Sequence, residues 1–512
     1  MGKEYNWLPE LESIVPFEAY GYDVSIYSIA YEAWRRGLNL KFEHIYQGTK
    51  YLLRYTIYNK DNRVKFNHTR PNIVTNEAVK ICNNSQTTRE ILEKESIPVP
   101  RGKVLKNFQA DSIRRNIKDL TFPLLIKPLN GKSGKDLIAG ISDVDELIEK
   151  VGYLNKKINS TPIVVEEYIA GENYSAFVIG DKVVGTLKWL PSYVIGDGNK
   201  TIRRLIREKN SVRMKNPGTF DEKIKINRSL NKELKEQGYD VQSVPAEGKV
   251  IGLQAKNSSF SKGDAIDATD ELPDHLNNDL VKAVKAIPGL TQAGVEVVYN
   301  KEKGDYLILG INTNPSIKNH LFPIKGNAHL IPKAIIDYYF PETKDNYLNQ
   351  TTPKYYFDFH FVKDYLLNNR LEMFTIPSYP YEPNLNSKKI KFNSEIDLLK
   401  IDRMIQNVFH QYNFNGELSL VSFNEYELSV AGNYQDIANF IDDLSSKQEI
   451  SNLASEDYNG PIRIGYTFNN EVTDSKDLAK EIANLKREKE MLINSKSWKI
   501  TAPLRKIFNK IK

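Results

Sequence analysis

Apolar and polar positions along this 512-residue chain follow two periods, one typical of strands and one typical of helices. Near the middle of the chain, a period of two residues predicts a β-hairpin over residues 293–299 and 305–312. Helical spacing predicts helices over residues 24–37, 87–94 and 143–151. Further strands are predicted over residues 40–45, 51–58, 122–128, 163–169 and 175–179. This mixture predicts an α/β multidomain protein.

The last part of the chain follows a different order of elements. Over residues 353–467 the predicted order is strand, helix, strand, strand, helix, strand, with the first strand over residues 355–361. This is the split βαβ, ferredoxin-like α+β plan. Residues 413–419 and 428–441 resemble the acylphosphatase family, but the Gly-rich, Arg-ended anion loop of that family has no match near residues 355–365. We therefore predict a structural or regulatory acylphosphatase-like domain, and acylphosphatase activity is the alternative.

The predicted hairpin places polar residues among apolar ones. Glu296 interrupts an apolar strand, and Ile308, Gly310 and Asn312 are expected to share one face of the partner strand, because alternate residues point the same way. A carboxylate and a carboxamide oxygen on adjacent strands suit Mg²⁺, a hard cation that prefers oxygen ligands and phosphates. Glu296 and Asn312 are therefore the predicted metal ligands.

Length and composition bound the rest of the picture. Hydrophobic residues make up 40% of the chain, which is enough for several cores, and the length suggests about three or four domains. Cys82 is the single cysteine, so no intrachain disulfide can form, which fits a reducing cytosol. Neither a signal peptide nor an apolar run long enough to span a membrane is expected, so a cytoplasmic location is predicted.

Breaks in the pattern divide the chain into five predicted parts. They are an N-terminal α/β domain, a small lobe, a large lobe with the metal and substrate site, the ferredoxin-like domain and a helical tail. Their predicted boundaries are residues 1–100, 101–185, 186–341, 353–467 and 474–512.

The formal net charge of +6 is concentrated at the C-terminal end. Residues 491–512 contain six basic residues and no acidic residue, so the remaining chain is formally neutral. This distribution argues against nucleic acid as a partner and for a local anionic one. Residues 495–508 resemble tails of bacterial glycosyltransferases that build surface polysaccharides. We predict peripheral contact with the inner face of the membrane through residues 495–512, and a solvated basic helix or short coiled coil is the alternative.

Several motifs point to a nucleotide site. Lys127 ends an apolar strand, where an anion would offset its desolvation. Residues 130–135 form a Gly-rich loop of the kind that lets backbone N–H groups approach phosphate. Residues 164–171, with the sequence VVEEYIAG, follow in the position of a hinge. In this order, and with the hairpin, these motifs resemble the ATP-grasp ligases over about residues 20–341, in the branch that holds fused glutathione-synthesising enzymes and cyanophycin synthetases.

The resemblance implies an N-terminal α/β domain followed by two α+β lobes that bind ATP and Mg²⁺. Lys127 would contact the phosphates and adenine, Glu166 would accept from the adenine amino group, and the backbone after Glu166 would contact the ring edge. Asn173 would bond the ribose, and Lys188 would face the reacting phosphate. The implied nucleotide-binding residues are Lys127, Gly131, Lys132, Ser133, Gly134, Glu166, Glu167, Ile169 and Asn173. The implied catalytic residues are Lys127 and Lys188.

Four positions depart from the family pattern. That pattern has a lysine at position 85, arginines at positions 175 and 254, and a metal-bridging glutamate at position 310. This chain has Ser85, Ser175, Gln254 and Gly310 instead. Charge stabilisation usually dominates at such sites, so the ligase is predicted to lack one main magnesium ligand. His320 is expected to line the pocket, and metal binding by His320 is the less favoured alternative.

The leading prediction is an ATP-dependent carboxylate–amine ligase that forms an amide through an acylphosphate. The tail suggests small-molecule or polymer-linked carboxylate and amine substrates, in the biosynthesis of a bacterial surface polysaccharide. The alternative is a catalytically impaired pseudo-ligase that binds nucleotide and acts as a scaffold in an envelope-biosynthesis complex. A homo-oligomer is compatible with either prediction.

Overall fold

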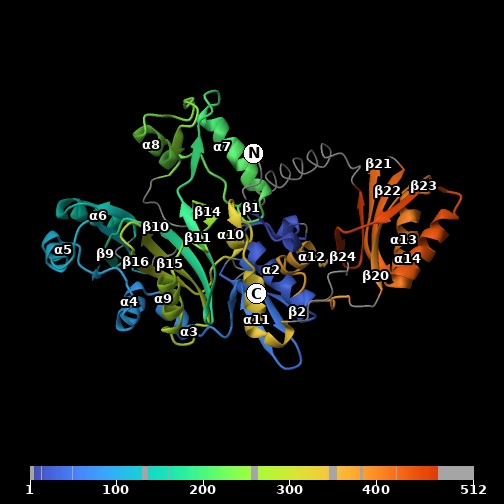
Figure 1. Ribbon diagram of the computed structural model, residues 1–512, viewed down its shortest axis with the longest axis horizontal. Coiled ribbons are helices and arrows are strands. Elements are labelled where there is room, and N and C mark those ends of the chain that lie inside the picture. Colours follow the sequence, from blue (N-terminus) through green and yellow to red (C-terminus); the bar gives the residue numbers. More distant parts are fainter. Residues whose placement is uncertain are drawn as a thin grey trace, which may run out of the picture. The chain divides into compact units, whose positions relative to one another are not determined.

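The computed structural model describes residues 5–12, 14–48, 50–129, 136–158, 161–254, 263–344, 354–380, 384–422 and 424–470 (Figure 1). The chain divides into two compact units: the first comprises Met1–Gln350 and Asp358–Tyr379, and the second comprises Thr351–Phe357 and Pro380–Lys512. The predicted tail over residues 474–512 lies outside the described residues. Among the helices that the structure describes, none combines the length and apolar character needed to cross a bilayer.

The first unit contains a five-stranded antiparallel sheet near its N-terminus. Its strands, in spatial order, are β19 (Met373–Ile376), β2 (Asn39–Gln47), β3 (Lys50–Tyr58), β4 (Arg63–Asn67) and β5 (Arg70–Pro71). Helices packed on this sheet or on each other are α2 (Val24–Arg35), α11 (Ile331–Tyr339) and α12 (Phe359–Leu367). Phe42, Tyr55 and Phe66 are fully buried on one face of the sheet, since alternate strand residues share a face. The predicted helix over residues 24–37 is confirmed as α2.

The strand predicted over residues 355–361 is wrong beyond its start. Strand β18 (Lys354–Tyr356) is only three residues long, and α12 follows it. The side chain of Asp358 caps this helix by accepting a hydrogen bond from the Phe361 N–H at 2.9 Å. The buried side chains of α12 recur with helical spacing, at Phe359, Val362 and Leu366. The Asp358 cap and the helical spacing of the buried residues therefore favour a helix over the strand that was predicted for residues 355–361.

The same segment corrects the predicted boundary of the last domain at residue 353. After α12, strand β19 pairs antiparallel with β2 and completes the N-terminal sheet. The ring of Phe359 lies 6.0 Å from that of Phe42, so α12 helps to build the N-terminal core. Residues 358–379 therefore belong to the first unit.

The predicted small lobe contains a four-stranded antiparallel sheet. In spatial order its strands are β6 (Gly102–Leu105), β9 (Ile163–Glu167), β7 (Leu124–Pro128) and β8 (Ile138–Ile141). Its helices are α5 (Ala110–Asn116) and α6 (Val144–Lys157). Asp143 caps α6 by accepting from the Glu146 N–H at 2.9 Å. Apolar residues of these strands and helices form one core, which includes Ile126, Leu147 and Val151.

The predicted large lobe is built on a second five-stranded antiparallel sheet. In spatial order its strands are β14 (Asp264–Asp267), β11 (Lys182–Leu190), β10 (Glu172–Ile179), β15 (Gln292–Asn300) and β16 (Asp305–Asn312). Helices α3 (Asn76–Cys82), α4 (Ser85–Lys94) and α9 (Asp274–Lys285) contribute to the core on one face of this sheet. The predicted hairpin over residues 293–299 and 305–312 is confirmed as β15 and β16.

Smaller elements complete the first unit. A separate small core lies within an excursion from the large lobe, made by β12 (Tyr193–Ile195), α7 (Ile202–Lys215), α8 (Arg228–Glu236) and β13 (Val250–Gly252). The remaining elements are β1 (Tyr5–Asn6), α1 (Pro9–Glu12), η1 (Phe17–Ala19), η2 (Gly21–Asp23), α10 (Lys318–Leu321), β17 (Gly326–Asn327) and η4 (Pro341–Thr343).

The second unit follows the order strand, helix, strand, strand, helix, strand, but its first strand is β20 rather than the predicted strand over residues 355–361. The order is β20 (Leu385–Ser394), α13 (Leu398–Tyr412), β21 (Asn415–Ser422), β22 (Glu425–Asn433), α14 (Tyr434–Ser445) and β23 (Ile450–Asp457). Two more strands follow, β24 (Pro461–Arg463), which pairs with β18, and β25 (Tyr466–Asn470). The spatial order of the main sheet is β23-β20-β22-β21-β25, and α13 and α14 cover the same face of it (Figure 1).

Candidate nucleotide and metal site

One row of residues crosses all five strands of the large-lobe sheet. The register pairs Glu296 with Gly310 on β16 and with Ser175 on β10. Ser175 pairs with Leu187 on β11, which in turn pairs with Asp267 on β14. Paired residues share a face, so these five residues lie on the face that is opposite to the buried core.

The two predicted metal ligands lie on this same face. Asn312 pairs with Gly294, which is two residues from Glu296 on β15, and residues two apart share a face. The side chain of Asn312 is held in place, because its Oδ1 accepts a hydrogen bond from the Asn314 N–H at 2.9 Å. The structure therefore brings Glu296 and Asn312 together as the sequence predicts.

A bulge changes the alternation of β16. The register shifts between Glu296 and Val297, which pair with Gly310 and Ile308, so Leu309 is an extra residue without a partner. Ile308 consequently turns into the core and is 2% exposed. The prediction that Ile308 shares a face with Gly310 is therefore wrong.

Glu296 has the properties of a carboxylate that lacks a partner. It is partly buried and forms no ion pair with any residue that the structure describes. Burial raises the pKa of Glu296, and the positive charge of Lys127 opposes that rise. A half-buried carboxylate with no direct partner fits a cation site, so the residues present fit a bound Mg²⁺.

The space beside Glu296 is open at position 310. A Cβ atom built on Gly310 would lie 3.8 Å from Oε2 of Glu296 and would meet nothing else within 4 Å. Within the described ranges, no cluster of three His, Cys, Asp or Glu side chains could hold a metal. A cation here would thus have Glu296 and Asn312 as protein ligands, with the others supplied by phosphate or water.

The small lobe contributes Lys127 to the site. Nζ of Lys127 lies 2.7 Å from Oε2 of Glu166. Nη1 of Arg89, on α4, lies 3.5 Å from Oε1 of the same buried Glu166. Each carboxylate oxygen retains a second lone pair, so Glu166 keeps the capacity to accept from a nucleotide.

Arg89 is a functional candidate that the sequence prediction missed. It lies one helical turn after Ser85, the position at which the family pattern has a lysine. Residues four apart lie on the same face of a helix. The positive charge of Arg89 therefore reaches the region in which the family pattern places the charge of a lysine at position 85. That spacing is the signal by which the sequence could have indicated Arg89.

The hinge after β9 offers backbone groups for an adenine ring. The N–H of Glu167 donates to the Arg101 carbonyl at 2.9 Å, so only its carbonyl group is left for a ligand. The N–H of Ile169 has no hydrogen-bond partner within the described part of the chain. A Cβ atom on Gly171 would lie 2.8 Å from the Tyr299 carbonyl oxygen, so this close approach of the hinge to β15 requires glycine.

Asn173 and Lys188 lie on opposite faces of the large-lobe sheet. Asn173 pairs with Val298, on the face of Glu296. Lys188 pairs with the buried Tyr174, on the core face, and its Nζ lies 2.5 Å from a carboxylate oxygen of Glu172. This geometry contradicts the prediction that Lys188 faces the reacting phosphate, and the predicted contact of Asn173 with the ribose stays a prediction.

A histidine–aspartate pair lies at the β14 end of the row. Nε2 of His329 lies 2.7 Å from Oδ1 of Asp267 and 2.7 Å from Oγ1 of Thr269. Asp267 is three strands from Glu296, or about 14 Å along the row. Nearby His320 is 3% exposed, and burial lowers its pKa to about 3. His320 therefore lines the interior, and no motif in the sequence indicated the pair formed by Asp267 and His329.

The remaining predicted residues cannot be placed. Gly131, Lys132, Ser133 and Gly134, which form the predicted phosphate loop, lie outside the described residues. The described site thus consists of the hinge, Lys127 and the large-lobe sheet.

Part of the chain that contains this site is similar to known proteins. Residues 82–192 match the RimK-like ATP-grasp domain. The chain is 29% identical over 272 residues to cyanophycin synthetase from Synechocystis sp., an alignment that covers 51% of this chain and 31% of that protein. It is 33% identical over 269 residues to the glutathione biosynthesis bifunctional protein GshAB of Clostridium perfringens, covering 51% of this chain and 34% of that protein.

The match to solved structures is weaker. A bifunctional glutathione synthetase from Pasteurella multocida has a TM-score of 0.44 and 24% identity, and the match covers 56% of this chain and 41% of that chain. The chain spans about a third of the length of the curated relatives that it matches. The chain therefore contains a RimK-like ATP-grasp domain that is homologous to those of cyanophycin synthetase and GshAB.

Proposed function

We propose that this chain is an ATP-dependent ligase that joins a carboxylate to an amine. ATP-grasp ligases use ATP and Mg²⁺. The observation that carries the proposal is the convergence of Lys127 from the small lobe and Glu296 from the large lobe. Lys127 is close enough to oppose the rise in the pKa of Glu296, and Glu296 has no ion-pair partner within the described part of the chain.

The proposed residues divide the binding of Mg-ATP among them. Glu296 and Asn312 would hold Mg²⁺, which shields the phosphate charge during transfer. Lys127 would neutralise phosphate charge, with Arg89 and Glu166 fixing its position. The N–H of Ile169 would bond the adenine ring, and Asn173 would bond the ribose.

The proposed reaction has two balanced steps. A carboxylate oxygen of the acid attacks the γ-phosphorus of ATP, and the bond to the β-phosphate oxygen breaks to release ADP. The amine nitrogen then attacks the carbonyl carbon of the acylphosphate, and inorganic phosphate leaves as the amide bond forms. The amine loses a proton to a base, and inorganic phosphate is one acceptor.

A second function is favoured by Gly310. The open position beside Glu296 leaves two protein ligands for the metal where the family pattern has three. A catalytically impaired protein that binds nucleotide and acts as a scaffold is therefore the second candidate.

One experiment separates the two candidates. The protein is incubated with Mg-ATP, candidate acids and candidate amines, while ADP release and the melting temperature are followed. ADP release that requires both an acid and an amine supports the ligase. A melting temperature raised by Mg-ATP without any turnover supports the scaffold. Unchanged ATP binding and turnover in Glu296→Ala would refute the proposed metal site.

The substrates and the location are also proposals. The resemblance of residues 495–508 to glycosyltransferase tails supports a cytoplasmic role in surface-polymer synthesis, with polymer-linked acids and amines as substrates and membrane contact through residues 495–512. Flotation with anionic vesicles, with and without those residues, tests the contact. For the second unit we propose a ferredoxin-like, acylphosphatase-like domain, which its βαββαβ order and its strand order support.

A further inference from the structure

Two arginines lie on the polar face of the N-terminal sheet. Tyr55 and Phe66 pair with each other, and Phe66 pairs with Pro71. The stacked rings of Tyr55 and Phe66 are buried in the core. Arg54 precedes Tyr55 and Arg70 precedes Pro71, so both arginines point to the opposite face.

Neither arginine has a carboxylate partner. Within the described ranges, neither Arg54 nor Arg70 forms an ion pair, and Nε of Arg54 is buried with no hydrogen-bond partner. Glu43, which pairs with Arg54 across β2 and β3, forms its ion pair with Lys65 instead. The two positive charges are close enough that Arg54, together with burial as the larger cause, lowers the pKa of Arg70.

Two half-buried cations without a counter-ion are costly. Like charges repel, and a partly desolvated charge loses hydration that only an opposite charge or hydrogen bonds restore. An arginine remains charged at neutral pH, and its planar fork matches the two oxygens of a carboxylate or the oxygens of a phosphate. The pair therefore has the chemistry of an anion-binding site.

The pair lies close to the proposed metal site. Oδ1 of Asn314 accepts from the Arg70 N–H at 3.0 Å, and Nη1 of Arg70 lies 3.4 Å from Oγ1 of Thr313. Thr313 and Asn314 directly follow Asn312, whose Oδ1 accepts from the Asn314 N–H. Asn314 is two residues after Asn312, a separation of at most about 7 Å, so Arg70 is anchored within the reach of a small substrate from the metal site.

We propose that Arg54 and Arg70 bind an anionic group of the acid substrate, separate from the carboxyl group that ATP phosphorylates. This inference rests on the proposed ligase function. It implies that the acid carries at least two anionic groups, the second being a carboxylate or a phosphate.

The test measures anion binding rather than catalysis. Inorganic phosphate and succinate are titrated at constant ionic strength into the full chain and into the variants Arg54→Gln, Arg70→Gln and Arg70→Lys, by calorimetry and melting temperature. The last variant keeps the charge but removes the planar fork. Lys60→Gln, which removes an exposed charge from the same domain, is the matched control. Lys127→Met reports any phosphate that binds at the nucleotide site instead.

The expected result is at least a tenfold loss of affinity in all three arginine variants and unchanged affinity in Lys60→Gln. Without added anion, Arg54→Gln should melt no lower than the parent, because it removes the repulsion with Arg70. Tighter binding of phosphate than of succinate would identify a phosphate-bearing substrate, and the reverse would identify a second carboxylate.

Two results would overturn the inference: no binding of either anion by the parent protein, or unchanged affinity in the arginine variants. ATP binding, measured in parallel, keeps this result distinct from the ligase proposal. A parent protein that binds ATP but not the anions retains the ligase and loses the arginine site. A parent protein that binds the anions but not ATP retains the arginine site and loses the ligase proposal.

Discussion

Glu296 and Gly310 face each other across β15 and β16 with no side chain between them. The Cβ position of residue 310 lies 3.8 Å from a carboxylate oxygen of Glu296. Any side chain at this position would therefore extend over the proposed metal site. The pairing explains how one glycine can reduce the charge at the site without disturbing the strand that carries Asn312.

Gly310→Glu tests whether this glycine weakens metal binding. A second carboxylate beside Glu296 should raise the affinity for Mg²⁺ in the presence of ATP by about tenfold, since divalent cations gain from each added anionic ligand. In EDTA the same variant should melt below the parent, because two adjacent carboxylates repel. Melting temperature and calorimetry measure both effects. Gly310→Gln adds the same bulk without the charge, so a similar gain in Gln would contradict the electrostatic explanation.

Arg89 should contribute to nucleotide binding, although the sequence pattern did not indicate it. Glu166 is shared by Lys127 and Arg89, so Arg89→Met should let Glu166 draw Lys127 away from the phosphates. We expect ATP affinity to fall about tenfold or more in Lys127→Met, and to fall by a smaller factor in Arg89→Met.

Binding of ATP measured by calorimetry checks both variants. Arg115→Met is the matched control, since Arg115 is an exposed cation on α5 of the small lobe, which also carries Lys127. If Arg115→Met loses as much ATP affinity as Arg89→Met, the loss is due to the change in net charge and not to the contact between Arg89 and Glu166.

The elements that the sequence predicted correctly have strong local signals. The strands of the β15–β16 hairpin are apolar runs, and the side chain of Asp143 caps α6. Lys127, Asn173, Glu296 and Asn312 lie on strands that the structure contains, and their roles toward nucleotide and metal stay predictions. The prediction that Ile308 shares a face with Gly310 was wrong because it depended on the register of β16. A single extra residue, Leu309, turns Ile308 into the core.

The other errors come from contacts distant in sequence. Lys188 was assigned to the site by motif, yet its pairing with Tyr174 fixes it on the core face. The helix α12 was predicted as part of a strand because its packing partner, Phe42, lies more than 300 residues earlier. The pairing of Lys188 leaves no signal in the local sequence, whereas α12 has local signals in the Asp358 cap and in the helical spacing of its buried residues.

Burial of His320 should make folding depend on pH. Burial lowers its pKa to about 3, below the unfolded value of about 6.5. The unfolded chain therefore binds a proton that the folded protein does not, so this contribution to stability is complete above pH 6.5 and is lost as the pH falls towards 3.

His320→Leu removes the titrating group and should flatten the decline of the free energy of unfolding between pH 6.5 and pH 4. Urea denaturation at each pH measures the decline. His68 is also buried, with its pKa lowered to about 4 by burial, so some pH dependence should persist. The exposed His360→Gln is the control. A pH profile of His320→Leu that is parallel to the parent would contradict the assignment.

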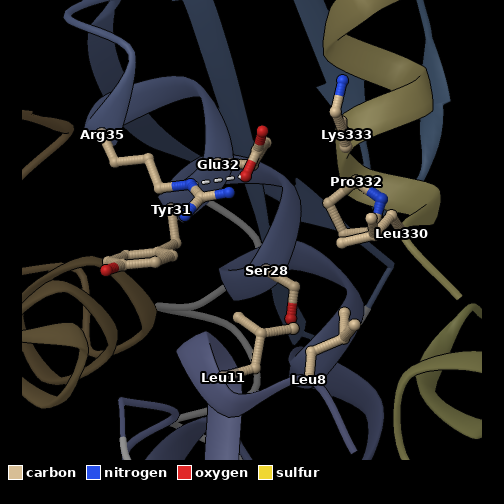
Figure 2. Close-up of a pocket in the computed structure, with 9 residues that line it drawn as sticks. All are labelled: Leu8, Leu11, Ser28, Tyr31, Glu32, Arg35, Leu330, Pro332 and Lys333. Atoms are coloured by element: carbon tan, nitrogen blue, oxygen red, sulfur yellow. Dashed lines mark hydrogen bonds and ion pairs between the residues drawn. The ribbon is translucent and has the colours of Figure 1, made fainter. Parts of the chain in front are cut away.

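Ser28 offers a stability test at a site away from the nucleotide. Its side chain faces a small cavity that is also lined by Leu8, Leu11 and Leu330 (Figure 2). The Ser28 hydroxyl is buried and has no hydrogen-bond partner within the described part of the chain. A buried unpaired hydroxyl costs about 1–3 kcal/mol, so Ser28→Ala should raise the free energy of unfolding by about 1 kcal/mol.

The matched control lies on the same helix. Ser25 is also buried, but its Oγ accepts from the Ile317 N–H at 3.1 Å. Ser25→Ala leaves that N–H unpaired and should lower the free energy of unfolding by about 1 kcal/mol. Urea denaturation of both variants measures the two effects. The two changes in the free energy of unfolding are expected to differ in sign because only the Ser25 hydroxyl has a hydrogen-bond partner. An equal loss of stability in Ser28→Ala and Ser25→Ala would contradict this explanation. It would show that the Ser28 hydroxyl is satisfied, for example by a buried water.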